Sequence, residues 1–307
     1  MHEFDAIDRY FRPLARSAGA FGLKDDVARL SPGGPGTIVT VDCLVESVHF
    51  FAADPIDTVA RKLVRVNVSD IHAKGALPRE ALLVLGWPSG RSESDLKPFS
   101  AALDEELAAW GIALIGGDTV ITPGHMFLSL TLTGDAIGAQ PVARSGARPG
   151  DGLWVTGEIG AGWCGLRDVR QGRQSRLADH YRVPNLPGAG GAQLVASFGT
   201  AAMDVSDGLL GDALKLAVES GVRVEIDREA VPMACPADGV MEQLTGGDDY
   251  QILFTAPASA EDDLSGAALK SGVKLHRIGT ISAGTGLELK SMGQAVSLPE
   301  TLGFAHE

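Results

Sequence analysis

Short blocks of apolar residues run along this chain, and the spacing within each block predicts its secondary structure. Residues 37–42 are β-branched and compact, which is typical of a buried strand, and the run ends in an aspartate. Within residues 55–74, Leu63 and Asp70 fall on one face of a predicted helix. An acid on this apolar face needs a partner, so Asp70 is a first candidate for chemistry.

The first half of the chain continues as alternating helices and strands. Residues 95–110 place leucines and a phenylalanine on one stripe and predict a second helix that stops at Gly111. Further strands are predicted at residues 81–85, 112–115 and 127–132. This alternation indicates the α/β (α+β) fold class.

A Pro-, Gly- and Arg-rich stretch at residues 140–151 divides the sequence into two halves. We place a domain boundary there, which gives predicted domains of residues 1–145 and 146–307. The second half passes through glycine-rich loops and then alternates again. Its predicted strands are residues 152–156, 202–205, 222–226, 250–255 and 273–278, and its predicted helices lie at 209–217 and 258–271.

Length, charge and cysteine content narrow the function classes. At 307 residues the chain is long enough for about two domains that each bury a core. Its net charge of −13 excludes the basic footprint of a nucleic-acid reader. Its apolar runs are far shorter than the roughly 20 residues of a membrane helix, and the acidic N-terminus lacks a signal-peptide pattern. Three widely spaced cysteines suit a reducing compartment, so we expect a cytoplasmic protein without membrane or nucleic-acid partners.

Aspartates gather where predicted strands and helices begin or end. They form the pairs 25–26, 204/207 and 248–249, and three more are Asp42, Asp70 and Asp118. A short carboxylate on a constrained loop is a good ligand for Mg²⁺, and several such acids cannot converge without cations between them. The sequence therefore predicts a metal site built from aspartates.

Four of these aspartates, and three other polar residues, also have a purely structural interpretation that local pattern leaves open. The structural alternatives are a helix cap for Ser206 and Asp207, a solvated turn for Asp25 and Asp26, a hairpin turn for Gly116-Gly117-Asp118, a surface position for His49, and a linker arginine for Arg144.

Signature motifs of other phosphate-handling and hydrolytic enzymes are absent from the sequence. There is no Gly-Lys-Ser/Thr loop, no His-Arg-Asp or Asp-Phe-Gly signature, and no Gly-x-Ser-x-Gly elbow. The glycines of residues 157–162 break the spacing of a dinucleotide fingerprint. A nucleotide would therefore be held by metal ions and backbone groups.

An ordered set of longer motifs resembles those of the bacterial thiamine-monophosphate kinases, from about residue 25 to the C-terminus. The motifs are Asp25-Asp26-Val27-Ala28, Thr40-Val41-Asp42, residues 45–50 (Val-Glu-Ser-Val-His-Phe), residues 67–76 (Asn-Val-Ser-Asp-Ile-His-Ala-Lys-Gly-Ala), Gly116-Gly117-Asp118-Thr119, Arg144-Ser145-Gly146-Ala147, Asp204-Val205-Ser206-Asp207-Gly208 and Gly247-Asp248-Asp249-Tyr250. Several long motifs in the right order are far more specific than any single glycine pattern.

This resemblance implies an activity and an architecture. The implied activity is the ATP-dependent phosphorylation of thiamine monophosphate to thiamine diphosphate, with several Mg²⁺ ions and with ATP as co-substrate. The implied fold has two domains and is similar to that of aminoimidazole ribonucleotide synthetase, with a C-terminal α/β sandwich. The resemblance also implies a homodimer in which the N-terminal sheets pair.

Carried over position by position, the resemblance also assigns roles to individual residues. The implied Mg²⁺ ligands are Asp26, Thr40, Asp42, Asp70, Asp118, Asp204 and Asp207. The implied nucleotide contacts are Gly117, Asp118, Arg144 and Ser206, and the implied substrate contacts are His49, Asp248 and Phe304. The implied catalytic residues are Asp42, Asp118, Arg144 and Asp207. The chain departs from the family pattern at Lys24 (usually Gly), Val41 (usually Ser or Thr), Ala101 (usually aromatic) and Asp248 (usually Glu).

Elementary phosphate chemistry agrees with this assignment. A phosphate acceptor has a second pKa of about 6 and is already anionic near neutral pH, so it needs no strong general base. The obstacle is repulsion between two anions, which Mg²⁺ and Arg144 would reduce during direct in-line transfer. The cationic thiazolium ring suits an acidic pocket with an aromatic wall such as Phe304. The alternatives are another ATP-using enzyme of the same superfamily, a non-catalytic homologue that binds thiamine phosphates, and a metal-dependent hydrolase.

Overall fold

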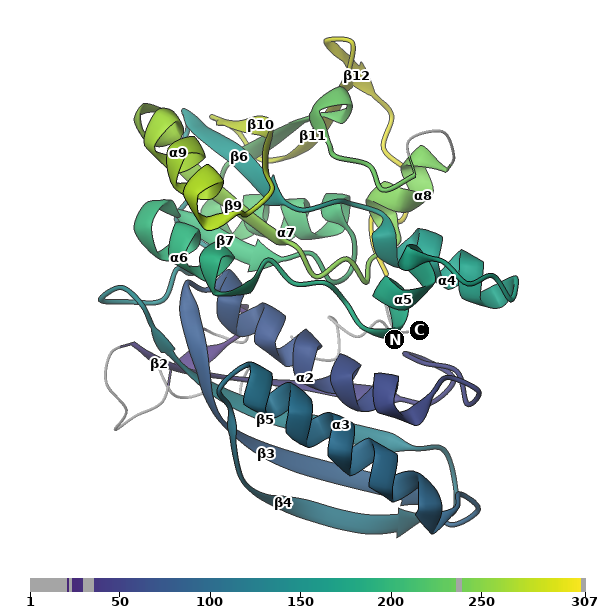
Figure 1. The fold of residues 1–307 in the computed structure, drawn as a ribbon. Coiled ribbons are helices and arrows are strands. Elements are labelled where there is room, and N and C mark those ends of the chain that lie inside the picture. Colours follow the sequence, from purple (N-terminus) through teal and green to yellow (C-terminus); the bar gives the residue numbers. More distant parts are fainter. Residues whose placement is uncertain (1–20, 22–23, 30–35, 236–238, 305–307) are drawn as a thin grey trace.

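The computed structural model describes residues 21, 24–29, 36–235 and 239–304, and these residues form two β-sheets with their helices (Figure 1). The predicted two-domain α/β fold is confirmed. One sheet is built from residues 28–136 and the other from residues 151–296. They therefore lie on either side of the Pro/Gly-rich stretch, and the exact cut at residue 145 stays a prediction.

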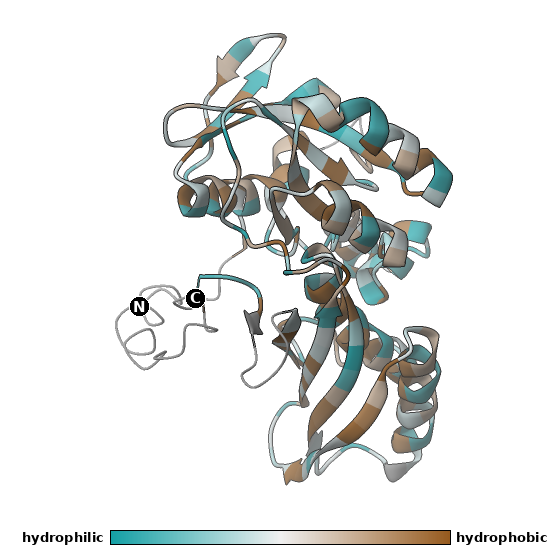
Figure 2. Ribbon diagram, turned by 90° about the vertical axis from the view of Figure 1, so that its left-hand side faces the viewer, coloured by the Kyte–Doolittle hydropathy of each residue, from teal (hydrophilic) through white to brown (hydrophobic). Residues whose placement is uncertain are grey.

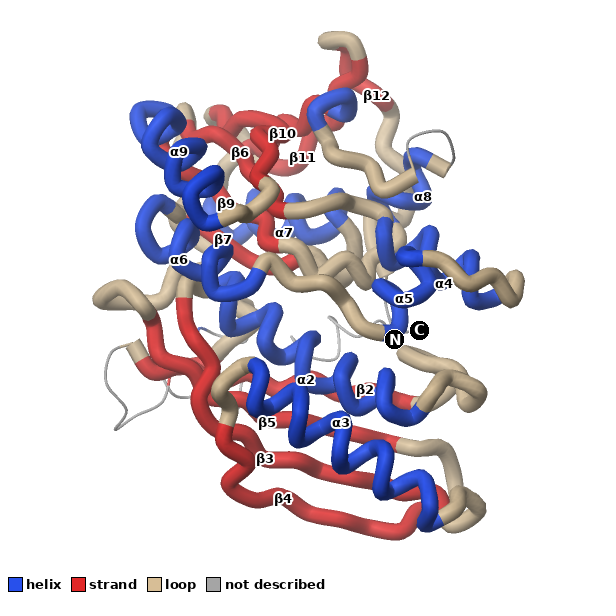
Figure 3. The backbone as a smooth tube through the Cα atoms, viewed as in Figure 1, coloured by secondary structure: helices blue, strands red, loops and turns tan. Residues whose placement is uncertain are grey.

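The first sheet has five strands, in the spatial order β1-β2-β5-β3-β4. Only the β3–β4 pair is parallel. Helices α2 and α3 pack on one face of this sheet, as Figure 3 shows. The elements are β1 (Ala28–Arg29), β2 (Thr37–Val45), α2 (Ile56–Ala73), β3 (Ala76–Pro88), a 3₁₀ turn (Glu93–Asp95), α3 (Leu96–Ala109), β4 (Ala113–Thr122) and β5 (Phe127–Ala136).

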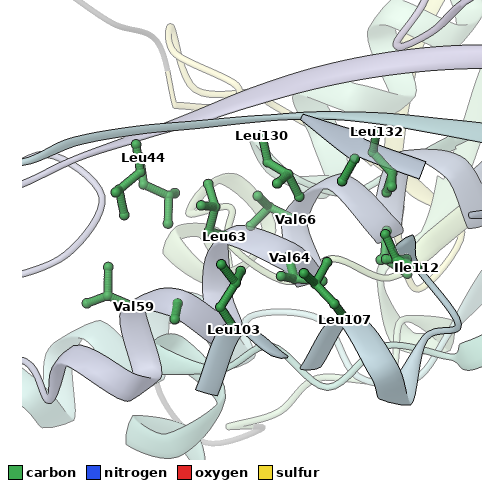
Figure 4. Packing of buried hydrophobic residues seen from close by; sticks show 14 of the residues in the cluster. Leu44, Val59, Leu63, Val64, Val66, Leu103, Leu107, Ile112, Leu130 and Leu132 are labelled. Atoms are coloured by element: carbon green, nitrogen blue, oxygen red, sulfur yellow. The ribbon is translucent and has the colours of Figure 1, made fainter. Parts of the chain in front are cut away.

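The core of this domain forms because strand alternation and helix periodicity point apolar side chains at one another. Leu63 from α2, Leu103 from α3 and Leu130 from β5 meet between the helices and the sheet, all of them buried (Figure 4). The opposite face of the sheet keeps large apolar side chains exposed, including Val41 (57%) and Leu82 (43%). In Figure 2 the strands of the first sheet lie in the lower half and carry hydrophobic residues, while α2 and α3 lie on the other side of the sheet.

The second sheet has seven strands, in the order β12-β11-β8-β10-β6-β9-β7. Its strands are β6 (Asp151–Thr156), β7 (Ala201–Asp204), β8 (Arg223–Asp227), β9 (Ile252–Pro257), β10 (Leu275–Ser282), β11 (Gly286–Ser291) and β12 (Gln294–Val296). Its helices are α4 (Ala161–Arg170), α5 (Arg176–Arg182), α6 (Gly188–Phe198), α7 (Leu209–Ser220), α8 (Val240–Thr245) and α9 (Glu261–Ser271), with 3₁₀ turns at Arg228–Ala230 and Ala258–Ala260.

The prediction of glycine-rich loops between β6 and β7 was wrong, because this region contains α4, α5 and α6. The glycines there serve close packing as well as turns. A Cβ added at Gly165 in α4 would lie 2.0 Å from the backbone oxygen of Leu177 in α5. Only a residue without a side chain allows α4 and α5 to approach this closely.

Two other expectations about strand ends were also wrong. Strand β2 continues to Val45, so Asp42 lies within the strand and not at its end. Residues 116–118 lie within β4 and do not form a hairpin turn. Both strands continue past their predicted ends because residues 43–45 pair with β5 and residues 116–122 pair with β3 through the backbone.

Helix α2 is the element that joins the two sheets. It packs on β2, β3 and β5 of the first sheet and on α6, β7 and β9 of the second. Most residues of α2 are therefore buried, and several of its side chains lie between the two domains. Among the helices that the structure describes, none combines the length and apolar character needed to cross a membrane.

Candidate active site

The predicted functional residues gather at a cleft of about 450 Å³ between the two domains. Those that line it are Asp26, Thr40, Asp42, His49, Asp70, Arg144, Asp204, Ser206, Asp207, Asp248 and Phe304. Gly117 and Asp118 are the predicted residues that the structure places elsewhere. The cleft thus brings together segments that lie up to 278 residues apart (Asp26 to Phe304).

Three aspartates from different elements converge at one end of the cleft. Carboxylate oxygens of Asp26, Asp70 and Asp204 all lie within 4.8 Å of one another. The Thr40 hydroxyl joins them, because its oxygen lies 2.5 Å from Asp70 Oδ2 and 3.0 Å from the backbone oxygen of Asp26, and its one proton is shared between these two acceptors. Asp204, the cluster member from the second domain, accepts a hydrogen bond at its Oδ2 from the Ser69 hydroxyl of α2 (2.7 Å). We call Asp26, Asp70 and Asp204 the aspartate cluster.

Two basic side chains hold the N-terminal side of this cluster. Lys74 Nζ is fully buried and lies 3.1 Å from Asp25 Oδ1 and 2.7 Å from Asp26 Oδ2, while Arg144 forms an ion pair with Asp26. Burial alone would raise the pKa of Asp26, but Lys74 and Arg144 outweigh it and lower this pKa. The interpretation of Asp25 and Asp26 as a solvated turn is therefore wrong.

The other acids of the cleft repel one another in the absence of a cation. Burial, followed by the charges of Asp26 and Asp207, raises the pKa of Asp42 to about 6. Burial and neighbouring carboxylates likewise raise the pKa values of Asp70 and Asp204. A site with this many buried carboxylate oxygens is suited to hard divalent cations such as Mg²⁺, whose binding would relieve the repulsion.

The start of α7 supplies a second acidic group and a lysine. Asp212 Oδ2 accepts hydrogen bonds from the backbone nitrogens of Asp207 and Gly208, both at 3.1 Å. Gly208 is the capping residue and no side chain caps it, so the cap interpretations of Ser206 and Asp207 were wrong. The Asp207 carboxylate instead contacts Lys215, which also bonds Asp212 Oδ1 at 2.9 Å.

A further part of the cleft lining, which we call the His49–Asp248 end, combines polar and aromatic side chains. Asp248 accepts from the Tyr250 hydroxyl through Oδ1 (3.0 Å), and His49 Nδ1 accepts from the backbone nitrogen of Val45 (3.0 Å). Tyr181 also lines this end. Phe304 is half exposed and lies beside the start of α7, since its backbone nitrogen donates to the backbone oxygen of Asp207 at 2.8 Å.

Asp118 lies far from this cleft within its own chain. Strand pairing sets Asp42 beside Leu130, Leu130 beside Leu83, and Leu83 beside Gly117. Three strand spacings of about 4.8 Å put the two backbones roughly 14 Å apart. Asp118 is paired with Val84 on the exposed outer face, whereas Asp42 shares the inner face with Leu130. One metal ion cannot therefore bind both carboxylates of a single chain.

Sequence reasoning missed three basic residues of the cleft and its walls: Lys62, Lys74 and Lys215. Lys62 and Lys74 pair with carboxylates from distant segments, and Lys215 pairs with Asp207 and Asp212 at the start of its own helix. A lysine in a helical pattern normally indicates a solvated face, so no local signal reports such burial.

Comparison with known proteins identifies the family. The models for the N-terminal and C-terminal domains of AIR synthase related proteins match residues 24–136 and 148–291. Over 323 residues the chain is 39% identical to the thiamine-monophosphate kinase of Caulobacter vibrioides, covering 99% of this chain and 90% of that relative. The chain belongs to the thiamine-monophosphate kinase family. Its predicted membership in this family is thereby confirmed.

Solved structures of thiamine-monophosphate kinases share this fold. A structure of AaThiL complexed with AMPPCP and TMP has a TM-score of 0.86 at 28% identity, covering 100% of this chain and 97% of that one. The thiamine-monophosphate kinase from Stenotrophomonas maltophilia has a TM-score of 0.77 at 34% identity, covering 96% and 98%. The family likeness therefore extends over both domains and the cleft between them.

Proposed function

We propose that this protein transfers the γ-phosphoryl group of ATP to thiamine monophosphate and so forms thiamine diphosphate. The observation that carries the proposal is the cleft itself, in which the aspartate cluster and the His49–Asp248 end lie together. The family likeness supports it, because the similar AaThiL structure is a complex with AMPPCP and TMP. Phosphoryl transfer from ATP to thiamine monophosphate requires the nucleotide site and the acceptor site to lie in one cleft, and the aspartate cluster and the His49–Asp248 end meet this requirement.

The donor set of the cleft fits Mg²⁺. Asp26, Asp70 and Asp204 would hold it. Asp42 and Asp207 lie close enough to interact electrostatically with each other and with this site. When bound, Mg²⁺ supplies positive charge that reduces the repulsion between the acceptor phosphate and the nucleotide. Several ions rather than one are proposed because five carboxylates lie together here, whereas one Mg²⁺ ion usually takes only one or two.

The protein's own residues contribute binding and orientation. Arg144 and Lys215 line the cleft beside the acids and add positive charge where the phosphates of ATP would lie. Ser206 also lines the cleft, and we propose it as a nucleotide contact. No residue has to act as a strong base, since the acceptor phosphate is anionic near neutral pH. Direct in-line transfer follows, without a covalent enzyme intermediate.

We further propose a homodimer in which the outer faces of the first sheets pair. That face exposes Val41, Leu82 and Val120, an apolar surface that a second copy would cover. β2 and β4 lie toward opposite edges of the sheet, so a two-fold arrangement can set β4 of one subunit beside β2 of its partner (Figure 1). Gly117 and Asp118 would then serve the cleft of the other subunit.

Product analysis tests the function directly. Purified protein is incubated with Mg-ATP and thiamine monophosphate, and thiamine diphosphate and ADP are quantified. We expect the two products one for one, and a loss of about a thousandfold or more in Asp42→Asn. ADP without thiamine diphosphate would indicate another acceptor or hydrolysis. Tight binding of thiamine monophosphate without turnover would favour a non-catalytic binding protein.

A further inference from the structure

Lys62 of α2 is a fully buried lysine that reaches out of the first domain. Its residue is 1% exposed, and its Nζ lies 2.8 Å from Asp248 Oδ2 of the second domain. The same ammonium donates to the backbone oxygen of His49 at 3.1 Å and lies 4.4 Å from the centre of the Tyr181 ring. One amino group therefore contacts both of the substrate residues predicted at this end of the cleft, His49 and Asp248.

Asp248 needs such support because its backbone is unusual. Asp248 has φ +61° and Tyr250 has φ +50°, a left-handed conformation that costs free energy for residues other than glycine. Such a segment persists only where surrounding contacts determine it. Here the Tyr250 hydroxyl holds Asp248 Oδ1 and Lys62 holds Oδ2, so each carboxylate oxygen has its own donor.

The His49 contact fixes a second segment in the same way. The turn after β2 is closed by hydrogen bonds from the backbone nitrogens of Val48 and His49 to the Val45 oxygen (3.1 and 2.9 Å). Lys62 donates to the His49 carbonyl of this turn, while the His49 ring accepts from the Val45 nitrogen. The turn and the Asp248 segment therefore share one anchor on a rigid helix.

We propose that Lys62 is a positioning residue for the acceptor substrate: it holds Asp248 and the His49 turn in the arrangement that binds thiamine monophosphate. This inference rests on the proposed function. Lys62 does not line the cleft itself, so it acts through these two residues and not by touching substrate. It also compensates the Asp248 charge, so that the carboxylate keeps one orientation at the cleft wall.

The decisive variant is Lys62→Met, which keeps the unbranched apolar stem to within one atom of its length and removes the charge and the donors. We expect the KM for thiamine monophosphate to rise about tenfold to a hundredfold, because small displacements of binding groups are costly. The KM for ATP is expected to change less than about threefold, since the aspartate cluster is untouched. Binding of thiamine monophosphate alone, measured by calorimetry, should weaken by the same factor. Lys270→Met, at an exposed position at the end of α9, is the matched control and should change neither constant.

A double-mutant cycle with Asp248→Asn separates positioning from simple stability. If Lys62 acts through Asp248, Lys62→Met should raise the acceptor KM much less in the Asp248→Asn background than in the wild type. The double variant leaves no buried unpaired charge. If Lys62→Met alone does not fold, the acceptor KM of the double variant can still be compared with that of Asp248→Asn. Equal rises in both KM values, or effects on the acceptor KM that multiply, would overturn the inference. Wild-type protein that forms no thiamine diphosphate would instead overturn the proposed function.

Discussion

The hydroxyl of Thr40 on β2 donates a 2.5 Å hydrogen bond to the Asp70 carboxylate on α2. This bond joins β2 of the first sheet to α2, the helix that carries Asp70. It also places the Thr40 hydroxyl oxygen beside the aspartate cluster. Thr40 also donates toward the Asp26 backbone oxygen at 3.0 Å. A single hydroxyl thus ties two of the three clustered acids together.

Replacing Thr40 by valine should weaken Mg²⁺ binding with little change in packing, because the two side chains have the same shape. We expect Thr40→Val to raise the Mg²⁺ concentration for half-maximal activity about tenfold, corresponding to about 1.4 kcal/mol. Thr40→Ser keeps the hydroxyl and should stay within about threefold of wild type. A Mg²⁺ titration of the melting temperature gives a readout independent of turnover. Identical titrations for Thr40→Val and wild type would exclude a role for this hydroxyl.

Mixing two inactive variants tests whether Asp118 acts across the proposed dimer. Asp118→Asn and Asp42→Asn should each be inactive, because each removes a carboxylate that every cleft uses. In a mixed dimer, the Asp118→Asn subunit still supplies Asp42 and the Asp42→Asn subunit still supplies Asp118. One of the two clefts therefore contains both carboxylates. After subunit exchange we expect about one quarter of wild-type activity to return. If Asp118 acts within its own chain, the mixture should stay inactive.

Substitution on the outer face of the sheet tests the dimer itself. Leu82 lies in β3 and is 43% exposed in the single chain. Leu82→Asp would place a charge in the proposed interface, so we expect a monomer by size-exclusion chromatography with light scattering. The loss of the dimer should also lower activity, because Asp118 would no longer reach the cleft of the partner subunit. A Leu82→Asp protein that remains dimeric would place the interface elsewhere.

Most of the cleft could be predicted from the sequence, because its acids belong to motifs in a fixed order. Asp118 shows the limit of such reasoning. It belongs to an equally clear motif, yet its place depends on the order and register of the strands, which local pattern does not give. Lys62 shows a second limit, since its burial depends on a carboxylate 186 residues away. Long-range partners of this kind leave no periodic signal.

The fold was predicted best where one period dominated. The apolar stripes of α2, α3 and α7 and the runs in β2 and β5 match elements that the structure contains. The region of α4 to α6 was missed because its glycines indicate turns when taken alone. In the structure Gly165 and Gly191 lie inside helices, where neighbouring atoms leave no room for a Cβ. Tertiary packing, which a local pattern does not contain, decides their conformation.

Gly208, between Asp207 and α7, should tolerate no side chain. Its φ is +131°, and an added Cβ would lie 2.7 Å from the backbone carbon of Thr245. We expect Gly208→Ala to destabilise the protein by about 2–4 kcal/mol, which denaturant unfolding would measure. The matched control is Gly266→Ala in α9, where nothing lies within 4 Å of the added Cβ. This control should gain about 0.5–1 kcal/mol from helix propensity, and similar stabilities for the two variants would contradict the packing argument.

His180 should make the folded protein sensitive to mild acid. It is buried on α5, its Nδ1 accepts from the Asn185 nitrogen at 3.3 Å, and burial lowers its pKa from 6.5 to about 4. The unfolded chain therefore takes up a proton more readily than the folded one between these values. Stability from the neutral ring is present above pH 6.5 and is lost as the pH falls toward 4, by about 2 kcal/mol between pH 7 and pH 5.

The variant His180→Asn isolates this contribution, because its amide oxygen can replace the Nδ1 acceptor without titrating. Denaturant unfolding at pH 7 and pH 5 should show a loss of stability about 2 kcal/mol smaller in His180→Asn than in wild type. His125, whose side chain is 67% exposed, provides the control, and His125→Asn should keep the wild-type slope. Buried acids such as Asp249, whose pKa burial raises to about 7, act in the opposite direction in both proteins, so the difference between slopes reports His180 alone. Parallel slopes for wild type and His180→Asn would mean that the folded protein accommodates the charged ring.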